Sequence, residues 1–219
     1  MTRVRAAWRR WSVSPGMIRL TRARITLQWW LAGKPVPPPN VVKQRTVIRY
    51  QARYGLRTFV ETGTYTGEMV HAMSGHVDRI ISIEVAPALH AQAAKRFGRQ
   101  PHIRLLLGDS AVLLPNVLES LDGPALVWLD GHYMGGESGR GSDETPIMKE
   151  LTALVAHPVR GHVVLIDDAR LFDGTGGYPR LDELTAWVKA RRPGTHVRVD
   201  GDMIRCVFDA GDRSGGVRQ

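Results

Sequence analysis

The sequence has little cysteine, few long apolar runs and no acidic residue near its N-terminus. Its single cysteine, Cys206, excludes an internal disulfide and a cysteine-based zinc cluster, and it is typical of a reducing compartment. A secretory signal needs about 7–15 uninterrupted apolar residues, and a membrane span needs about 20. Arg19, Arg22 and Arg24 interrupt every candidate for either in the first part of the chain. We therefore expect a cytoplasmic protein.

The positive charge of the chain is concentrated at its front. The 219 residues carry 30 Lys and Arg against 21 Asp and Glu, a formal net charge of +9. Residues 1–34 hold eight of the basic residues and no acid, so the rest of the chain is close to neutral. A domain that grips a nucleic-acid backbone carries its basic stripe on the folded body, so nucleic acid is not an expected partner.

The basic segment 1–34 also contains tryptophan, at Trp8, Trp11, Trp29 and Trp30. Arginine and tryptophan together are typical of a segment that lies on an anionic membrane surface, so peripheral membrane contact is one expectation, and packing on a partner is another. The segment is also compatible with docking on its own domain or with an organelle transit peptide. Helical projection of 17–32 scatters the apolar residues over more than one face, so no clean amphipathic helix is predicted.

Prolines at positions 35 and 37–39 cannot continue a helix and mark a boundary. We divide the chain into a basic N-terminal extension with a Pro-rich linker over 1–40 and a folded domain over 41–219. In the domain, β-branched and aliphatic runs alternate with segments of helical spacing, which is the pattern of a doubly wound, mostly parallel α/β sheet. The strands are expected at 58–64, 79–85, 103–109, 125–131 and 162–169, the helices at 68–74, 87–97, 111–121, 146–156 and 181–190.

The last two strands are expected at 196–199 and 204–208, on either side of Asp200-Gly201-Asp202. This arrangement predicts an antiparallel hairpin at the C-terminal edge of the sheet. With it, the sheet has seven strands.

Each of the five parallel strands carries a carboxylate toward its carboxyl end, at Glu61, Glu84, Asp109, Asp130 and the pair Asp167-Asp168. Ligands of such sheets bind at the carboxyl ends of the strands, near the point where strand order reverses. Gly63 and Gly67 permit a tight turn after the first strand, but their spacing fits neither the G-x-G-x-x-G fingerprint nor a P-loop. Glu84 lies at the end of the second strand, where an acid can accept both hydroxyls of a ribose, so the glycine turn and this acid together suit an adenosine nucleoside.

Four motifs together resemble the successive motifs of class I S-adenosylmethionine-dependent methyltransferases, which have a Rossmann-like fold. They are the segment 59–67, Ile83-Glu84, Gly108-Asp109-Ser110 and Leu129-Asp130-Gly131-His132, and the resemblance covers about 56–210. It implies S-adenosylmethionine as the cofactor, with the ribose on Glu84 and the adenine beside Asp109 and Ser110. The remaining cofactor contacts that it implies are Glu61, Thr62, Gly63, Thr64, Tyr65, Gly67 and Asp130. Tyr65 stands where the family usually has a glycine, so we expect the loop backbone to take a different route there.

Asp130, Asp167 and Asp168 form a second group of candidate site residues. Three carboxylates at neighbouring strand ends repel one another unless a positive group lies between them, and oxygen ligands suit Mg²⁺ or a similar divalent cation. The motifs are similar to those of metal-dependent sugar O-methyltransferases of macrolide and aminocoumarin pathways. That resemblance implies these three aspartates as metal ligands and His132 as the general base. The alternatives are that one of the pair caps the next segment, that Asp130 alone contacts the cofactor and that His132 is a solvated loop residue.

These features favour a methyltransferase that transfers a methyl group from S-adenosylmethionine to a hydroxyl of a small molecule, with help from a divalent cation. The Gly-rich segment 133–145 is expected to act as a substrate lid or as a plain connection. A nucleotide-dependent oxidoreductase is an alternative that the absent G-x-G-x-x-G argues against. A non-catalytic nucleoside-binding protein at a membrane surface is another, and an RNA methyltransferase is a further one.

Overall fold

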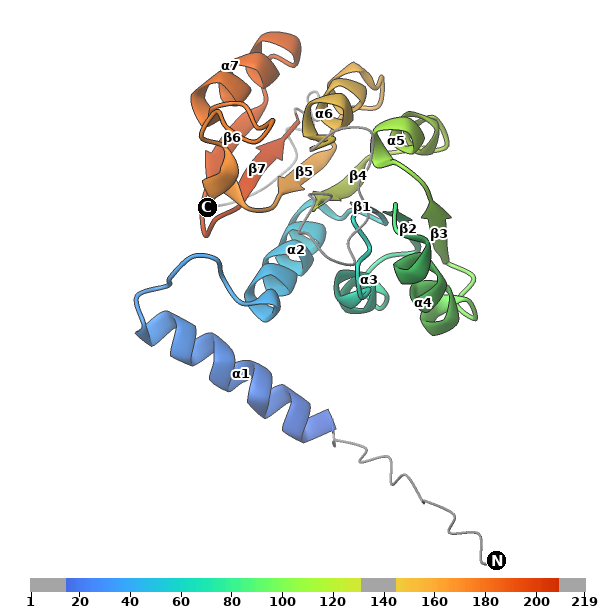
Figure 1. The fold of residues 1–219 in the computed structure, drawn as a ribbon, viewed down its shortest axis with the longest axis vertical. Coiled ribbons are helices and arrows are strands. Elements are labelled where there is room, and N and C mark those ends of the chain that lie inside the picture. The colour runs from blue at the N-terminus through green and yellow to red at the C-terminus, as the bar shows by residue number, and fades with distance from the viewer. Residues whose placement is uncertain (1–14, 131–144, 209–219) are drawn as a thin grey trace, which may run out of the picture.

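The computed structural model describes residues 15–130 and 145–208, and its centre is one seven-stranded sheet (Figure 1). The strand order is β3-β2-β1-β4-β5-β7-β6. The first five strands pair in parallel, and β7 pairs antiparallel with both β5 and β6. This confirms the predicted fold class, including the C-terminal hairpin. The strands are β1 (Thr58–Thr62), β2 (Arg79–Glu84), β3 (Ile103–Leu107), β4 (Ala125–Leu129), β5 (Val163–Ile166), β6 (His196–Val199) and β7 (Ile204–Val207).

Helices cover both faces of the sheet, in two groups (Figure 1). The chain runs outward from β1 to β3 and then restarts at β4 on the other side of β1. Because crossovers between parallel strands are right-handed, the two directions of travel place their helices on opposite faces. One face carries α2 (Asn40–Tyr54), α3 (Glu68–Met73) and α4 (Pro87–Phe97), and the other carries α5 (Ser110–Glu119), α6 (Ile147–Ala156) and α7 (Leu181–Arg191).

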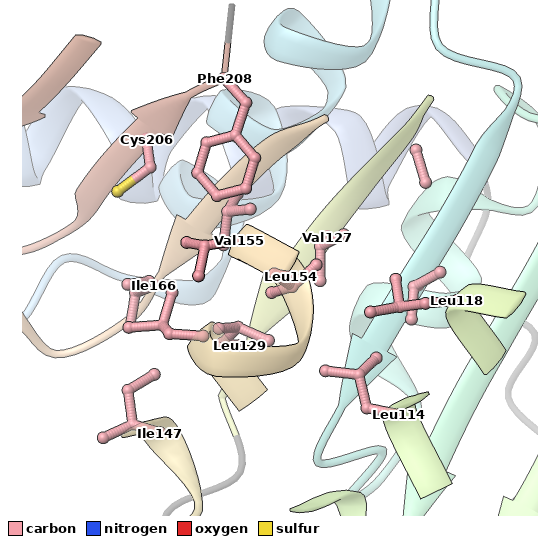
Figure 2. Packing of buried hydrophobic residues seen from close by; sticks show 14 of the residues in the cluster. Leu114, Leu118, Val127, Leu129, Ile147, Leu154, Val155, Ile166, Cys206 and Phe208 are labelled. Carbon is pink, nitrogen blue, oxygen red and sulfur yellow. The ribbon is translucent and has the colours of Figure 1, made fainter. Parts of the chain in front are cut away.

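The central strand β4 shows how the sheet builds two cores. All five of its residues are buried, as expected for a parallel strand covered on both sides. Val127 and Leu129 pack with residues of α5 and α6, whereas Leu126 and Trp128 belong to the core on the other face. Figure 2 shows the first of these cores, in which Leu154 of α6 lies over the sheet. Each such aliphatic side chain contributes about 1.5–3 kcal/mol to folding through its removal from water.

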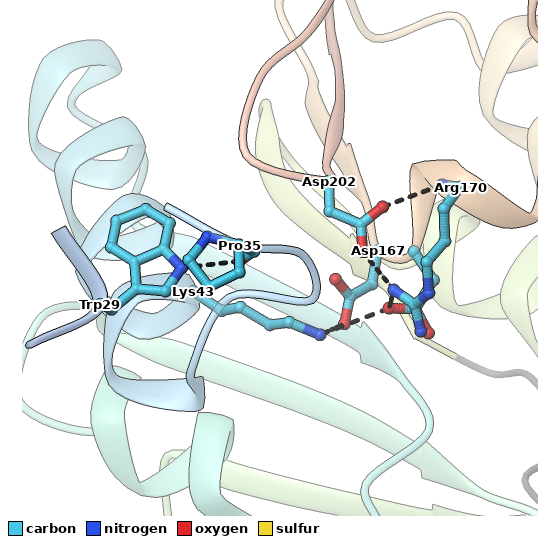
Figure 3. Close-up of polar contacts among 7 residues, drawn as sticks. Trp29, Pro35, Lys43, Asp167, Arg170 and Asp202 are labelled. Carbon is cyan, nitrogen blue, oxygen red and sulfur yellow. Dashed lines mark hydrogen bonds and ion pairs between the residues drawn. The ribbon is translucent and has the colours of Figure 1, made fainter. Parts of the chain in front are cut away.

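The helix α1 (Pro15–Leu31) lies away from the sheet and contacts the domain at α2 (Figure 1). A short linker joins it to α2, and the Trp29 Nε1 group donates a hydrogen bond to the carbonyl of Pro35 at 2.8 Å (Figure 3). The predicted boundary between extension and domain falls at the first residues of α2. Among the residues described, no helix has both the length and the apolar character needed to cross a membrane.

Candidate functional site

The strand order reverses between β1 and β4, and a pocket lies at this switch point. Its volume is about 420 Å³, counted with its open mouth. The loop after β1, the end of β4 and the helices α2 and α3 supply its walls. The lining residues are Asn40, Lys43, Gln44, Glu61, Gly63, Thr64, Tyr65, Thr66, Glu68, Met69, Trp128 and Asp130.

The loop after β1 is shaped by left-handed backbone conformations. Gly63, Tyr65 and Gly67 have φ angles of 91°, 47° and 75°. A Cβ atom at Gly67 would lie 2.4 Å from a ring carbon of Phe97, so this position has no room for a side chain. Tyr65 accommodates the missing glycine by taking the left-handed conformation itself, which costs a non-glycine residue about 1–2 kcal/mol. Its side chain is 59% exposed at the pocket.

Glu84, at the end of β2, holds the loop after β1 in place through a hydrogen bond. One carboxylate oxygen accepts the Tyr65 N–H at 2.7 Å, and the other accepts the Ala86 N–H at 2.9 Å. The side chain is buried beside the pocket but does not line it. Each oxygen retains a second lone pair, so the carboxylate can hold the loop and still accept a hydroxyl from a ligand.

Glu61 is a buried carboxylate in the pocket wall. Its Oε2 accepts a hydrogen bond from the Ser82 hydroxyl at 2.5 Å, and the Ser82 and Thr64 hydroxyls lie 2.6 Å apart. Burial raises the pKa of Glu61 well above its usual value, although the Ser82 hydrogen bond opposes this. A cationic group bound in the pocket would therefore strongly stabilise the ionised form of Glu61.

The other predicted cofactor residues lie around the pocket without lining it. The Asp109 carboxylate accepts the Ala111 N–H at 2.9 Å and so caps α5, with Ser110 buried as the first residue of that helix. Both follow β3, two strands away from β1. Thr62 is buried at the end of β1, and its carbonyl accepts the Asp130 N–H at 3.0 Å. The structure thus brings Glu61, Gly63, Thr64, Tyr65 and Asp130 into the pocket wall, and leaves Thr62, Gly67, Glu84, Asp109 and Ser110 outside it.

The three predicted metal ligands do come together. One oxygen each from Asp130, Asp167 and Asp168 lies within 4.8 Å of the others. Asp168 turns the chain directly after β5 with a left-handed φ of 54°. Its carboxylate faces the Lys43 ammonium and the Arg170 guanidinium, rather than a backbone N–H of the 3-10 helix Ala169–Leu171 that follows. The capping alternative for this residue is therefore not what the structure shows.

Two side-chain cations lie against these acids (Figure 3). Lys43 of α2 pairs with Asp167, and its Nζ lies 3.5 Å from Asp168. Arg170 pairs with Asp168 at 2.7 Å and with Asp202 of the hairpin turn. The acids raise the pKa of Lys43, although burial alone would lower it, and burial raises the pKa of Asp167 despite the ammonium beside it. Lys43 therefore carries its positive charge at neutral pH.

Sequence reasoning missed both Lys43 and Asp202. Lys43 falls within the expected domain, but the only indication that it could reach the site is its position next to the buried residues Val41, Gln44 and Val47 of α2. Asp202 was placed only in the hairpin turn. Since β7 pairs with β5, this turn returns to the carboxyl end of β5, where the acidic pair lies.

The residues present fit a divalent cation. Three carboxylates are the donors that Mg²⁺ and similar hard ions prefer. Asp167 Oδ1 is buried and has no hydrogen-bond partner among the described residues, so the cluster contains a carboxylate oxygen that could coordinate a metal ion. Lys43 already supplies part of the positive charge that a metal was expected to supply, and an ion bound to all three acids would compete with it. His132 and most of the expected lid, 133–144, lie outside the described residues.

No family model and no curated protein matches the sequence. Solved structures do match the fold. The O-methyltransferase TomG from Streptomyces achromogenes, in complex with S-adenosylmethionine, is 14% identical over 87% of this chain and 89% of its own, with a TM-score of 0.55. An O-methyltransferase from Bacillus cereus in complex with S-adenosylhomocysteine is 14% identical over 87% and 91%, with a TM-score of 0.56. A methyltransferase from Podospora anserina bound to the same product is 13% identical over 90% and 89%, with a TM-score of 0.54. The chain therefore has the fold of class I S-adenosylmethionine-dependent methyltransferases.

Proposed function

We propose that this protein is an S-adenosylmethionine-dependent methyltransferase that methylates a hydroxyl of a small molecule. The observation that supports the proposal most strongly is that the pocket and the acidic cluster share one residue, Asp130. Asp130 lines the pocket at the switch point and also belongs to the acidic cluster, so a donor in the pocket and an acceptor at the cluster would meet beside this residue. TomG and the Bacillus cereus enzyme, which have this fold, are O-methyltransferases whose structures contain the donor or its product.

Different residues in and beside the pocket would bind different parts of S-adenosylmethionine, the methyl donor. The buried Glu61 carboxylate would pair with the ammonium of the methionine part, which offsets the cost of ionising it in the protein interior. Glu84 would accept the ribose hydroxyls with its remaining lone pairs, while it holds the Tyr65 N–H. Asp109 and Ser110 would lie by the adenine. When bound, the donor supplies a methyl group on a sulfonium.

Asp130, Asp167 and Asp168 would hold the divalent cation. When bound, such an ion supplies positive charge that lowers the pKa of a hydroxyl placed on it. His132, two residues after Asp130 in the sequence, would accept the proton of that hydroxyl. The contribution of the described residues is positional: the Asp130 backbone N–H is fixed to β1 and the Asp167 N–H to β4, so the acids keep their places at the edge of the pocket.

A pair of variants tests this division of roles. We expect Glu84→Gln to weaken S-adenosylhomocysteine binding at least tenfold and to leave Mn²⁺ binding unchanged. Asp168→Asn should do the reverse, because it removes one charge from the cation site and none from the pocket. Calorimetry measures the first affinity and electron paramagnetic resonance the second.

Glu119→Gln, at an exposed carboxylate that ends α5, is the matched control and should change neither affinity. If each site variant loses both ligands to the same extent, the two sites are not separate and the assignment fails. Binding of NAD in place of S-adenosylhomocysteine would favour the oxidoreductase alternative.

A further inference from the structure

The helix α1 has an inner side that touches α2. Arg22, Thr26 and Trp29 recur at helical spacing, and they are its half-buried residues among those whose side chains are described. Arg22 donates a hydrogen bond to the Gln44 side chain, and Arg45 donates one to the Thr26 hydroxyl at 3.2 Å. One side of this helix is therefore already docked on the domain.

The opposite side carries an apolar stripe. Met17, Leu20, Leu27 and Leu31 are 57%, 73%, 56% and 68% exposed. Together with Arg24 they follow each other at steps of three and four residues, so they lie along one side of the helix. We call these five residues the outer stripe. Scattered exposed leucines are ordinary, but several exposed apolar side chains along one side of a helix are typical of an interaction surface.

The surroundings of the outer stripe are wholly basic. The first acidic residue of the chain is Glu61, so neither α1 nor α2 contains an Asp or Glu. Exposed cations flank the stripe and continue along both helices, at Arg19, Lys34, Arg45, Arg49 and Arg53. Whatever covers the stripe must therefore accept apolar side chains and supply negative charge at the same time.

A second copy of the helix does not meet that requirement. Arg24 is seven residues from Met17 and seven from Leu31, at the middle of the stripe. Pairing of two stripes in register, parallel or antiparallel, would place Arg24 against Arg24, with no acid on α1 to neutralise the pair. On an anionic bilayer the same arginine can bury its aliphatic stem and extend its guanidinium to the lipid phosphates.

We propose that the outer stripe is a binding surface for an anionic lipid bilayer, and that α1 holds the domain at such a surface. Met17, Leu20, Leu27 and Leu31 would enter the boundary between headgroups and acyl chains. The arginines would contact the headgroup phosphates. Trp30, which is 57% exposed and next to the stripe, suits the depth of the headgroups. This inference is independent of the reaction that the domain catalyses.

Co-sedimentation of the full chain with vesicles tests the proposal. Vesicles of phosphatidylcholine with about one-third phosphatidylglycerol should bind the protein, and vesicles of phosphatidylcholine alone should not. The double variant Leu20→Gln, Leu27→Gln should lower the affinity for the anionic vesicles at least tenfold. Its fold should not change, because both side chains are exposed.

The matched control is Val112→Gln, Val199→Gln, which alters two exposed apolar residues of the domain and should bind as the unaltered protein does. Failure of the full chain to bind anionic vesicles would overturn the proposal, and so would undiminished binding of the Leu20/Leu27 variant. Light scattering provides the remaining test. A dimer that this variant dissociates would show that a second copy, and not a bilayer, covers the stripe.

Discussion

Lys43 changes the interpretation of the acidic cluster. The sequence shows three acids that need a positive partner, and a metal is the simplest partner to infer from strand ends alone. The structure adds an ammonium from α2, 124 residues before Asp167 in the chain, and a guanidinium from Arg170. The positions of the acids follow from the alternating pattern, because each acid lies at or near the end of an apolar run. Which side chain of a covering helix reaches them depends on packing, which the pattern does not contain.

We expect Lys43→Met to raise the affinity of the cluster for Mn²⁺ at least tenfold, about 1.4 kcal/mol, because the ion no longer has to displace an ammonium. The same change leaves buried carboxylates without their partner, so the metal-free variant should unfold at a lower temperature and regain stability when Mn²⁺ is added. Electron paramagnetic resonance and thermal unfolding measure the two effects. Lys189→Met, at an exposed lysine of α7, is the control. Unchanged or weaker Mn²⁺ binding in Lys43→Met would show that the two cations do not share a site.

At the scale of elements, the order and type of the helices and strands from β1 onward were predictable and their ends were less so, whereas the helix α2 was not among the expected elements. The first strand was expected to reach residue 64 and the third residue 109, but β1 ends at Thr62 and β3 at Leu107. The residues just beyond these points are Gly63-Thr64 and Gly108-Asp109, and there the backbone leaves the sheet to form the loops of the site. Left-handed residues such as Gly63 cause the departure, and their conformation is not visible in an apolar pattern.

Glu150 on α6 is a buried acid that sequence reasoning did not single out. Burial raises its pKa to about 7 from 4.5, although the Ser110 and Thr62 hydroxyls oppose the shift. Between these two pH values the folded chain keeps a proton that the unfolded chain has lost, so the free energy of unfolding falls as the pH rises. The loss is complete above pH 7 and amounts to about 3 kcal/mol.

Glu150→Gln keeps the shape and removes the charge. The variant should therefore be more stable than the unaltered protein by up to about 3 kcal/mol at a pH of about 8, with this advantage vanishing as the pH falls to about 4.5. Urea unfolding at several pH values measures the difference, and Glu119→Gln is the exposed control. An advantage that is independent of pH would show that Glu150 is not the titrating group.

At the scale of the whole molecule, the count of charges located the basic segment, but it did not show which side of α1 faces α2. Helical projection alone finds apolar residues on more than one face, and this is accurate, since Trp29 lies on the inner side and Leu27 on the outer side. The structure separates the two sides because it shows α2 against one of them. The molecule is thus a nearly neutral sheet domain with its pocket at the switch point, preceded by a basic helix with an open apolar stripe.

The central claim is that this pocket binds S-adenosylmethionine. Calorimetric titration of the full chain with S-adenosylhomocysteine, once with Mg²⁺ and once with EDTA, tests it most directly. We predict one site per chain with a micromolar dissociation constant in both conditions, because the pocket residues Glu61 and Tyr65 and the adjoining Glu84 do not depend on the cation. Absence of binding in both conditions would contradict the account and would mean that the carboxylates at the strand ends serve a different ligand.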